Sequence, residues 1–489
     1  MPEPETPESS QSHRLIVPGA EAEAAAAPRI ITPSEARAKP APPSLEPSED
    51  ESAHDESEVA PRASRIILPP GVARGAPEDL PEYPKLRPLV LVPVSNGKRE
   101  FLLVTDPLGV TPGQPVLGIE ALGLLQLLDG SASLTEISAA VMRESKDLRV
   151  GNMVREFIGQ LDDLLMLDSP RFQAAWKALR DAYHPLEIRQ AAFEDRSYPG
   201  QREALAKFLD AHFAEAAARP AQAGRSAPRA DARPRAILAP HLDPRRAGAT
   251  IAEAYAEIGP DQKAPLRVVV FGTGHSLVDD LVALTRKHFE TPLGKVACDT
   301  AFVDLVAERL GDAAYRSEIA HRDEHSIEFQ AVYLKRHLGD RPLTLVPILC
   351  GGFHVLLDRG VTPREDPTFE AMIEAVREAE RKLGGATMYA AGVDLSHVGT
   401  RFGDAAIDAQ VKGEVEALDR EALEAARLGD ADRWYAAIAA HGDSTRICGF
   451  APTYALLRCA DVKDGRLLHY EQSDEPGGST VSIAAMAWG

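Results

Sequence analysis

Residues Ala236 to Ser276 read AILAPHLDPRRAGATIAEAYAEIGPDQKAPLRVVVFGTGHS, and this stretch decides the fold. It contains two apolar runs, 236–239 and 268–271, with a helix-like segment between them. The first run is followed by His241 and the second by His275. Short continuous apolar runs joined by a helix are typical of parallel strands buried on both faces, so we expect two neighbouring parallel strands. Ligands bind such sheets at the carboxyl ends of the strands, which makes the two imidazoles a candidate site.

The alternation of strand and helix continues to the end of the chain. Two further apolar runs, 344–350 and 387–394, are candidate strands of the same sheet. The last two candidates, 466–473 and 481–488, are separated by Gly477-Gly478, so we expect them to pair antiparallel. The sequence therefore predicts a mixed α/β sheet with helices on both faces.

Composition limits the classes of function. A chain of 489 residues is expected to hold more than one domain. Its net charge of -20 argues against nucleic acid as a partner, because such proteins present a basic face. The sequence has no apolar run of about 20 residues for a membrane span and no basic, apolar leader at its start. The four cysteines show no framework spacing, so we expect reduced thiols and a cytoplasmic location without membrane attachment.

The first 80 residues are predicted to be a disordered tail. They are rich in Pro, Ala, Glu and Ser and contain almost no aromatic residues, so they cannot bury enough apolar area to fold. Two apolar islands, RLIVPGA at 14–20 and SRIILPPG at 64–71, interrupt this composition. We interpret them as incidental apolar residues of a tail, with docking motifs as the alternative.

Residues 84–170 are predicted to form a small winged-helix-like domain. Asn96-Gly97 between two strand-like runs predicts a hairpin. A leucine repeat that stops at Asp129-Gly130 predicts a first helix. Ser133 and Glu136 have the spacing of a capping box and predict a second helix, and a third carries apolar residues up to Leu164. Residues 171–185 are expected to be a linking helix.

This domain resembles the PqqD-like family of small modules. The similarity covers about residues 86–168 and is carried by LGLLQLLDGSASLTEISAAV and VREFIGQLDDLLML. The resemblance implies a module that binds a precursor peptide and presents it to a radical-SAM enzyme. The alternative is a structural winged helix without a ligand.

Three more segments bring reactive side chains to the predicted sheet edge. The strand at 387–394 ends in Asp394-Leu-Ser-His397, and a carboxylate beside an imidazole can orient or charge it. Glu324 and His325 begin a predicted helix, where the helix dipole explains the carboxylate. Cys448 precedes a glycine where a loop enters a helix, a position that favours thiolate.

The histidines and the cysteine together indicate a metal site. A single histidine is more often a hydrogen-bonded structural residue than a ligand, but here such residues recur at strand ends. Two imidazoles and one thiolate from three separate elements suit a transition metal better than Ca²⁺ or Mg²⁺. Three protein ligands would leave coordination positions open, as a catalytic site requires. Fe, Cu and Zn all fit this donor set.

The span 186–489 resembles the MEMO family, whose bacterial members are called AmmeMemoRadiSam system protein B. The motifs that carry the resemblance occur in order: IRQAAF…SYPG, ILAPH, GTGHS, ETPLG, EHSIEFQ, VPILCG, DLSHVG, ICG and VSIAA. The resemblance implies a fold similar to class III extradiol dioxygenases. It also implies a metal, iron or copper, bound by His241, His275 and Cys448.

The same resemblance assigns roles to three further residues. Asp394 and His397 would stand near the metal as acid/base groups, and His325 would line the pocket. The chain departs from the family pattern at Asp243, where the family has glycine. Asp243 would orient His241, add an oxygen ligand or narrow the access of a substrate.

Three functional hypotheses follow. The first is a non-haem metal-dependent redox enzyme, or a component that acts with a radical-SAM partner. The second is a non-catalytic adaptor that binds a peptide or protein substrate through the PqqD-like module and presents it to a radical-SAM enzyme. The third is a fold that has kept its histidines but lost its chemistry.

Overall fold

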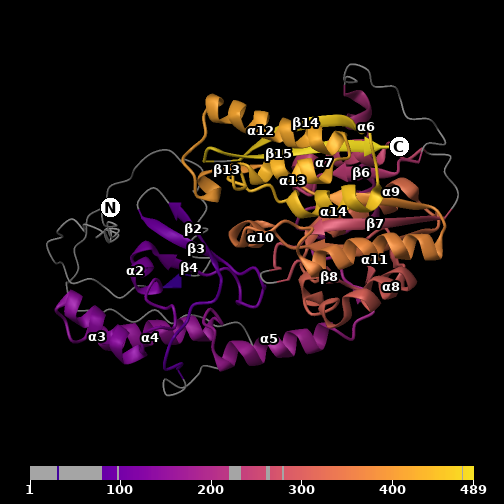
Figure 1. Ribbon diagram of the computed structural model, residues 1–489. Coiled ribbons are helices and arrows are strands. Elements are labelled where there is room, and N and C mark those ends of the chain that lie inside the picture. The colour runs from indigo at the N-terminus through magenta and orange to yellow at the C-terminus, as the bar shows by residue number, and fades with distance from the viewer. Residues whose placement is uncertain are drawn as a thin grey trace, which may run out of the picture. The chain divides into compact units, whose positions relative to one another are not determined.

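The structure is a computed structural model that describes residues 30–31, 80–95, 99–219, 233–259, 265–277, 280–475 and 477–489. The chain divides into two compact units (Figure 1). The N-terminal unit comprises 1–105 and 111–172, and the C-terminal unit comprises 106–110 and 173–489. The tail predicted over 1–80, with its islands at 14–20 and 64–71, lies outside the described residues except for 30–31 and 80.

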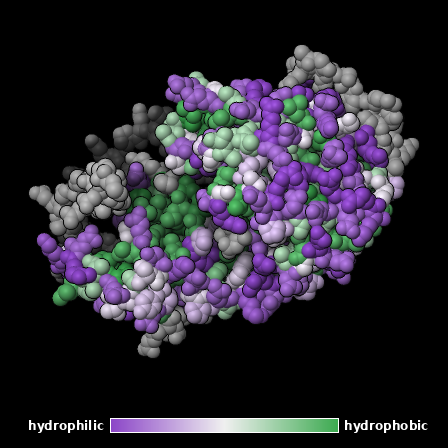
Figure 2. Space-filling model, viewed as in Figure 1, coloured by the Kyte–Doolittle hydropathy of each residue, from purple (hydrophilic) through white to green (hydrophobic). Residues whose placement is uncertain are grey.

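The N-terminal unit is built on a four-stranded sheet in the order β1-β4-β3-β2. The predicted hairpin is present: β2 (Val90–Ser95) and β3 (Glu100–Thr105) pair antiparallel. The sequence did not predict β4 (Val116–Gly118), which pairs with β3, or β1 (Ile30–Ile31), which adds antiparallel to β4. Figure 2 shows apolar side chains gathered over this unit, where Val90 is half exposed.

The helices of this unit pack on one apolar core. They are η2 (Ile119–Ala121), α2 (Leu122–Leu125), α3 (Leu134–Ser145) and α4 (Val150–Asp163), and α5 (Pro170–Tyr183) follows them. The predicted capping box is confirmed, since the Ser133 and Glu136 side chains each accept the other's backbone N–H. The first predicted helix is shorter than expected, because Leu128 and Asp129 instead pair with the backbone of Lys85 and Leu86.

The C-terminal unit is organised by a nine-stranded mixed sheet with the path β10-β11-β7-β12-β6-β15-β13. The first five strands of this path are parallel, and β8 and β14 pair antiparallel with β11 and β15. The strands are β6 (Ala236–Ala239), β7 (Leu266–Thr273), β8 (Val282–Leu284), β10 (Ala297–Cys298), β11 (Leu343–Cys350), β12 (Thr387–Gly392), β13 (His397–Gly399), β14 (Arg466–Glu475) and β15 (Ser479–Trp488). The predicted mixed α/β sheet and its antiparallel last pair are confirmed. A separate parallel pair joins β5 (Ile188–Arg189) to β9 (His288–Phe289).

Helices cover both faces of this sheet, as predicted. One face packs against α6 (Arg202–Ala218), α7 (Pro244–Tyr255) and α9 (His325–Leu338). The other packs against α8 (Thr300–Leu310), α10 (His354–Arg359), α11 (Pro367–Leu383), α12 (Ala409–Arg427), α13 (Ala431–Ala439) and α14 (Phe450–Ala460). Short 3₁₀ turns are η3 (Gly311–Ala313), η4 (Glu318–His321) and η5 (Thr400–Phe402). Alternate strand residues enter the two cores, so Ile237 faces α7 and Leu238 faces α14.

The expected order of the strands needs correction. The strands that precede His241 and His275 are not neighbours, because β12 lies between β6 and β7 and pairs parallel with both. This arrangement brings a third strand end to the same edge. On the N-terminal side of β6, α6 continues to Ala218, and 220–232 lie outside the described residues. No helix in the described part of the chain is long and apolar enough to cross a membrane.

His321 gives a pH-dependent contribution to the stability of this unit. Its buried imidazole donates from Nε2 to the carbonyl of Ala283 on β8, 3.0 Å away, and burial lowers the pKa of His321 from 6.5 to about 4. As the pH falls, His321 of the unfolded chain takes up a proton near pH 6.5, whereas His321 of the folded protein takes it up only near pH 4. Stability contributed by the neutral ring is present above pH 6.5 and is lost as the pH falls toward 4.

We predict that the free energy of unfolding of His321→Gln falls by about 3 kcal/mol less than that of the wild type between pH 6.5 and 4. Urea denaturation at a series of pH values measures this difference. The matched control is His354→Gln, which alters an exposed histidine on α10. Equal pH slopes for wild type and His321→Gln would contradict the assignment.

Candidate metal centre

Seven side chains converge at the carboxyl edge of the parallel strands. His241 follows β6, His275 follows β7, and Asp394 follows β12. The remaining four come from the start of α9, from β13 and from the loop that enters α14. All six residues singled out in the sequence belong to the cluster, and the seventh is Glu324: His241, His275, Glu324, His325, Asp394, His397 and Cys448.

His241 is held with one ring nitrogen directed at a thiol. Its side chain is only 2% exposed, and Nδ1 donates to the carbonyl of Gly392, 2.8 Å away. Since a carbonyl can only accept, the proton resides on Nδ1 and leaves a lone pair on Nε2. That Nε2 lies 3.3 Å from Cys448 Sγ. Burial, followed by the nearby His275, lowers the pKa of His241 to about 3.

His275 is oriented by a carboxylate. Its Nδ1 and its backbone N–H both lie 3.0 Å from Glu324 Oε2. Desolvation works against protonation of His275, but the Glu324 carboxylate outweighs it and raises the pKa of the imidazole. The side chain of His275 is 42% exposed, so the cluster opens to solvent on this side. Nε2 of His275 is left for another ligand.

Glu324 has two partners at once. It is the N-cap of α9, where its side chain accepts the N–H of Ser326 at 2.9 Å, and it also binds His275. Burial opposes its ionisation, but His275, His325 and the Ser326 N–H together lower the pKa of Glu324. A carboxylate that holds a histidine in a single orientation is the usual partner of a metal-binding imidazole.

His325 packs between the two other imidazoles. Its ring is nearly parallel to that of His275, with centroids 4.9 Å apart, and lies edge-on to that of His241 at the same distance. Phe193 and Phe329 contact its other sides. Burial lowers the pKa of His325 to about 3, so this imidazole is a neutral ring that closes one wall of the cluster.

Asp394 links the loop that carries His241 to the Cys448 thiol. Its Oδ1 accepts the backbone N–H groups of His241 and Leu242, at 2.9 and 3.0 Å. Its backbone carbonyl accepts the N–H of Gly449 and lies 3.5 Å from Cys448 Sγ. Burial raises the pKa of both Asp394 and Cys448, so both are protonated more readily than in water.

His397 stands at the rim of the cluster. Its Nδ1 lies 2.9 Å from the carbonyl of Leu395 and 3.2 Å from that of Arg446, which fixes the proton on Nδ1. Burial lowers the pKa of His397. Asp394, His397 and Cys448 each offer one ligand atom within 4.8 Å of the others.

Two glycines allow α9 to approach the sheet. A Cβ atom on Gly392 would lie 2.2 Å from the backbone oxygen of Ser326, and one on Gly272 would lie 2.5 Å from Ser326 Oγ. Gln330, one turn further along α9, donates to the carbonyl of Pro240 at 2.9 Å. The Ser326 contacts place the first turn of α9, with Glu324 and His325, beside the ends of β7 and β12, and the Gln330 contact holds the next turn beside the end of β6.

A buried ion pair fixes the position of α9. Arg189 and Glu328 form a salt bridge in which both side chains are 0% exposed. Arg189 also donates to the backbone carbonyls of His321 and Glu324, at 2.9 and 2.8 Å. Glu328 accepts from the Tyr198 hydroxyl and from two backbone N–H groups at 192 and 193. These bonds explain why the IRQAAF and SYPG segments accompany the histidine motifs.

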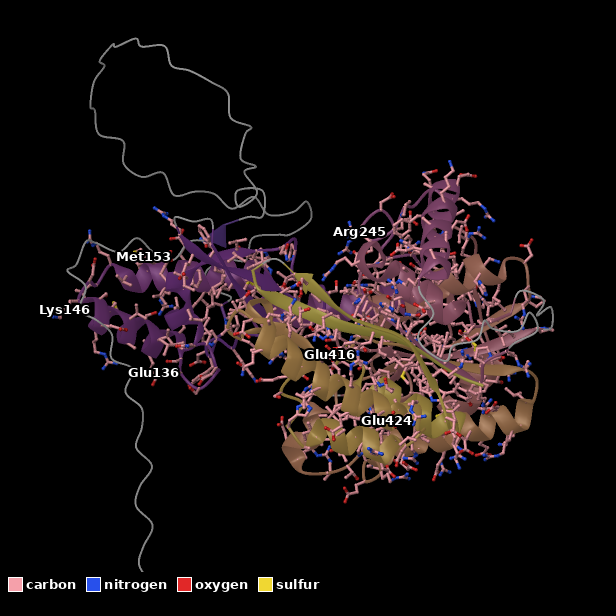
Figure 3. All side chains as sticks on the ribbon, turned by 90° about the horizontal axis from the view of Figure 1, so that it is seen from above. Glu136, Lys146, Met153, Arg245, Glu416 and Glu424 are labelled. Atoms are coloured by element: carbon pink, nitrogen blue, oxygen red, sulfur yellow. The ribbon has the colours of Figure 1, made fainter. Side chains whose placement is uncertain are left out.

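The side chain of Asp243 caps the helix that follows it. Its side chain is the N-cap of α7, where it accepts the backbone N–H of Arg245 at 2.9 Å, and it pairs with the Arg245 guanidinium. Figure 3 labels Arg245 on the first turn of this helix, and Glu416 and Glu424 on α12. Capping accounts for the carboxylate at this position, and Asp243 is not a member of the candidate ligand groups.

The donor set fits a transition metal. His241, His275 and Cys448 each offer a ligand atom, and these atoms lie within 4.8 Å of one another. Both imidazoles already use Nδ1, toward the Gly392 carbonyl and the Glu324 carboxylate, which leaves both Nε2 atoms as ligands. The ligand atoms of a second group, His275, Glu324 and His325, also lie within 4.8 Å of one another, but Glu324 already caps α9 and binds His275.

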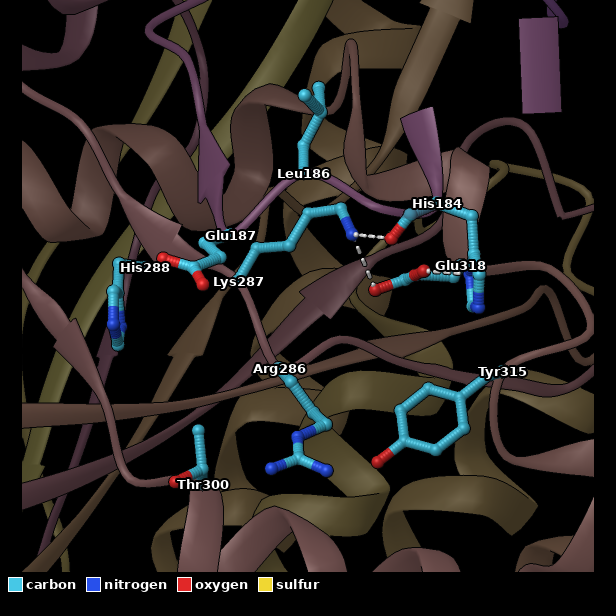
Figure 4. A pocket seen from close by; sticks show the side chains of 9 residues that line it. All are labelled: His184, Leu186, Glu187, Arg286, Lys287, His288, Thr300, Tyr315 and Glu318. Carbon is cyan, nitrogen blue, oxygen red and sulfur yellow. Dashed lines mark hydrogen bonds and ion pairs between the residues drawn. The ribbon is translucent and has the colours of Figure 1, made fainter. Parts of the chain in front are cut away.

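A cavity of about 550 Å³ lies apart from this cluster (Figure 4). Its lining includes Arg286, Lys287, Tyr315 and Glu318, and none of the seven cluster residues. Lys287 donates to Glu318 at 3.1 Å and to the carbonyl of His184 at 3.0 Å. The ammonium group of Lys287 and the carboxylate of Glu318 drawn in Figure 4 therefore compensate each other within the protein.

Glu324 is the functional residue whose role the sequence reasoning did not recognise. The helix dipole explained its position, whereas in the structure it also orients His275. The signal was its place directly before His325, which brings a carboxylate to a helix end that also carries an imidazole. The pairing of Arg189 with Glu328 gave no such signal, because the two residues are 139 positions apart in the sequence.

Comparison with known proteins identifies the family of the chain. The sequence model of the family described as Memo-like protein matches residues 189–487, more than half of the chain. The chain belongs to the Memo-like family. Every residue of the seven-membered cluster lies within the matched span of this Memo-like chain.

Individual relatives extend the comparison. A MEMO1 family protein of Aquifex aeolicus is 24% identical over 410 residues, which cover 83% of this chain and 99% of the relative. A MEMO1 family protein of Thermus thermophilus is 28% identical, with 59% of this chain and 79% of the relative covered. The memo-1 homologue of Caenorhabditis elegans is 25% identical, with 52% and 71% covered. The Aquifex match is longer than 189–487, so it reaches into the sequence before the family span.

We predict that Glu328→Gln lowers the free energy of unfolding by about 3–5 kcal/mol, because it leaves the Arg189 guanidinium buried without its counter-charge. Denaturant unfolding measures the change. The matched control is Glu374→Gln in the exposed pair with Arg309, for which a loss of at most about 1 kcal/mol is expected. Equal losses in the two variants would show that the buried pair does not hold α9.

Proposed function

We propose that the C-terminal unit is a metal-dependent redox protein that binds iron or copper through His241, His275 and Cys448. The observation that carries the proposal is the 3.3 Å approach of His241 Nε2 to Cys448 Sγ, with Nδ1 of both histidines already engaged by other groups. Two imidazoles and one thiolate are a donor set suited to these metals. The likeness to class III extradiol dioxygenases belongs to the same proposal.

The metal would supply one-electron or oxygen chemistry, and the protein would supply binding and proton handling. The 42% exposure of the His275 side chain gives a substrate a route to the cluster. Asp394 and His397 line the far side, with one ligand atom each within 4.8 Å of the other and of Cys448. We assign them as the acid/base groups, and His325 as the wall of the pocket that excludes water from one side.

Metal content tests this proposal directly. Protein purified without oxygen is expected to carry near-stoichiometric iron or copper, and His241→Ala, His275→Ala and Cys448→Ala are each expected to lose it. Inductively coupled plasma mass spectrometry measures the content. Controls are His354→Ala, an exposed histidine, and Cys298→Ala, a buried cysteine outside the cluster. A wild-type protein that is metal-free and cannot be loaded would exclude the redox proposal.

The contribution of Glu324 to metal binding can be separated from its contribution as a helix cap. We predict that Glu324→Ala weakens metal binding by about 10–100-fold, because His275 loses the carboxylate that orients it. Competition with a chelator measures the affinity. Asp366→Ala is the matched control, since Asp366 is a buried N-cap on α11 and not a member of the cluster. Similar affinities in the two variants would reduce Glu324 to a cap.

A second candidate is the non-catalytic adaptor, in which a radical-SAM enzyme and a peptide or protein substrate are the partners. The observation that favours it is a separate N-terminal unit with its own apolar core, which the metal centre does not require. The likeness of this unit to PqqD-like modules belongs to this candidate. Turnover by metal-loaded protein would favour the enzyme, and stable binding without turnover would favour the adaptor.

A further inference from the structure

The edge strand of the N-terminal sheet is already paired with a piece of the tail. Ile30 lies opposite Leu117 and Ile31 opposite Val116, in an antiparallel register. Both β4 residues are buried, and Leu117 belongs to the apolar core of the unit. An edge strand exposes unpaired backbone groups that bind extended peptides, so the pairing shows that β4 accepts a strand from elsewhere in the chain.

The paired segment is one of three copies of a short motif. Its sequence is Arg29-Ile-Ile-Thr-Pro33, and the two apolar islands of the tail contain Arg14-Leu-Ile-Val-Pro18 and Arg65-Ile-Ile-Leu-Pro69. All three place arginine first, two aliphatic residues next and proline fifth. Branched aliphatic residues favour a strand, and proline ends it because it has no N–H to donate.

The β4 edge carries a negative charge, opposite in sign to the arginine that the three copies of the motif share. The β4 residue next to the two observed pairs is Gly118, the last residue of the strand. A Cβ atom on Gly118 would lie 2.2 Å from Glu120 Oε1, so the exposed Glu120 carboxylate covers this position. This carboxylate would attract the positive charge of an arginine that precedes the paired isoleucines, because opposite charges across a strand pair stabilise it.

We propose that the three arginine–aliphatic–isoleucine–x–proline segments are interchangeable occupants of the β4 edge, with the arginine of the bound segment paired to Glu120. The inference is independent of the metal centre. The nearest copy ends 11 residues before Leu80, a span of up to about 36 Å, which exceeds the radius of a unit of this size. Tethering gives all three copies a high effective concentration, so any external strand competes with them for the edge.

Hydrogen exchange on the full chain tests the exchange between copies. Ile16→Asp, Ile31→Asp and Ile67→Asp are made singly and together, with Val59→Asp as an aliphatic tail control outside the motifs. Each single variant is expected to change the exchange of the Val116–Gly118 amides little, because another copy takes the edge. The triple variant is expected to accelerate it by at least about tenfold. The amides of Leu102 and Val104 on β3 report that the unit remains folded.

Two results would overturn the proposal. No acceleration in the triple variant would show that the edge is not held by these segments. Full acceleration in Ile31→Asp alone would show that the copies are not interchangeable.

A peptide tests the charge pair. The sequence of residues 62–71, added to the triple variant, is expected to restore protection of β4. Glu120→Arg is expected to weaken this binding by about fivefold, and the peptide with Arg65→Glu is expected to recover it. If the charge-swapped pair binds no better than the single reversal, the arginine does not meet Glu120.

Discussion

The geometry of the candidate metal centre depends on the buried ion pair between Arg189 and Glu328. Arg189 comes from a two-residue strand outside the main sheet, and Glu328 from the first turn of α9. The guanidinium also binds the carbonyls of His321 and Glu324, so it fixes the residues on both sides of the point where α9 begins. A buried charge without its partner is costly, so the pair admits few other positions for the helix. The orientation of His275 therefore follows from a contact remote in sequence.

The order of the strands adds the second constraint. Because β12 lies between β6 and β7, its last residue, Gly392, pairs with both neighbouring strand ends. The Gly392 carbonyl accepts from His241, and the absence of a side chain there lets the Ser326 backbone approach. Gly392 thus pairs in the sheet, leaves room for α9 and accepts the hydrogen bond that orients His241. These shared contacts explain why the cluster is compact although its members are spread over more than 200 residues of sequence.

Sequence reasoning was strongest where one element decides the outcome. The strands before His241 and His275, and the helix that follows Cys448, could be predicted because apolar runs and a glycine mark them locally. The order of the strands could not, since parallel pairing joins distant segments and a pattern of apolar residues is the same in any order. The double role of Glu324 was hidden because the helix dipole alone was a sufficient reason for a carboxylate there.

The charges of the cluster give a physical reason for it to take up a cation. Burial lowers the pKa values of His241 and His325 and raises those of Asp394 and Cys448, so all four favour their neutral forms in the protein alone. Neutral imidazoles offer free lone pairs, and a metal ion placed among them would stabilise the thiolate of Cys448. Binding of the metal would then release the proton of Cys448 and leave its thiolate close to His241. The charge of a bound metal would thus be compensated by loss of the Cys448 proton, beside the Glu324 carboxylate, whose pKa is lowered by its partners.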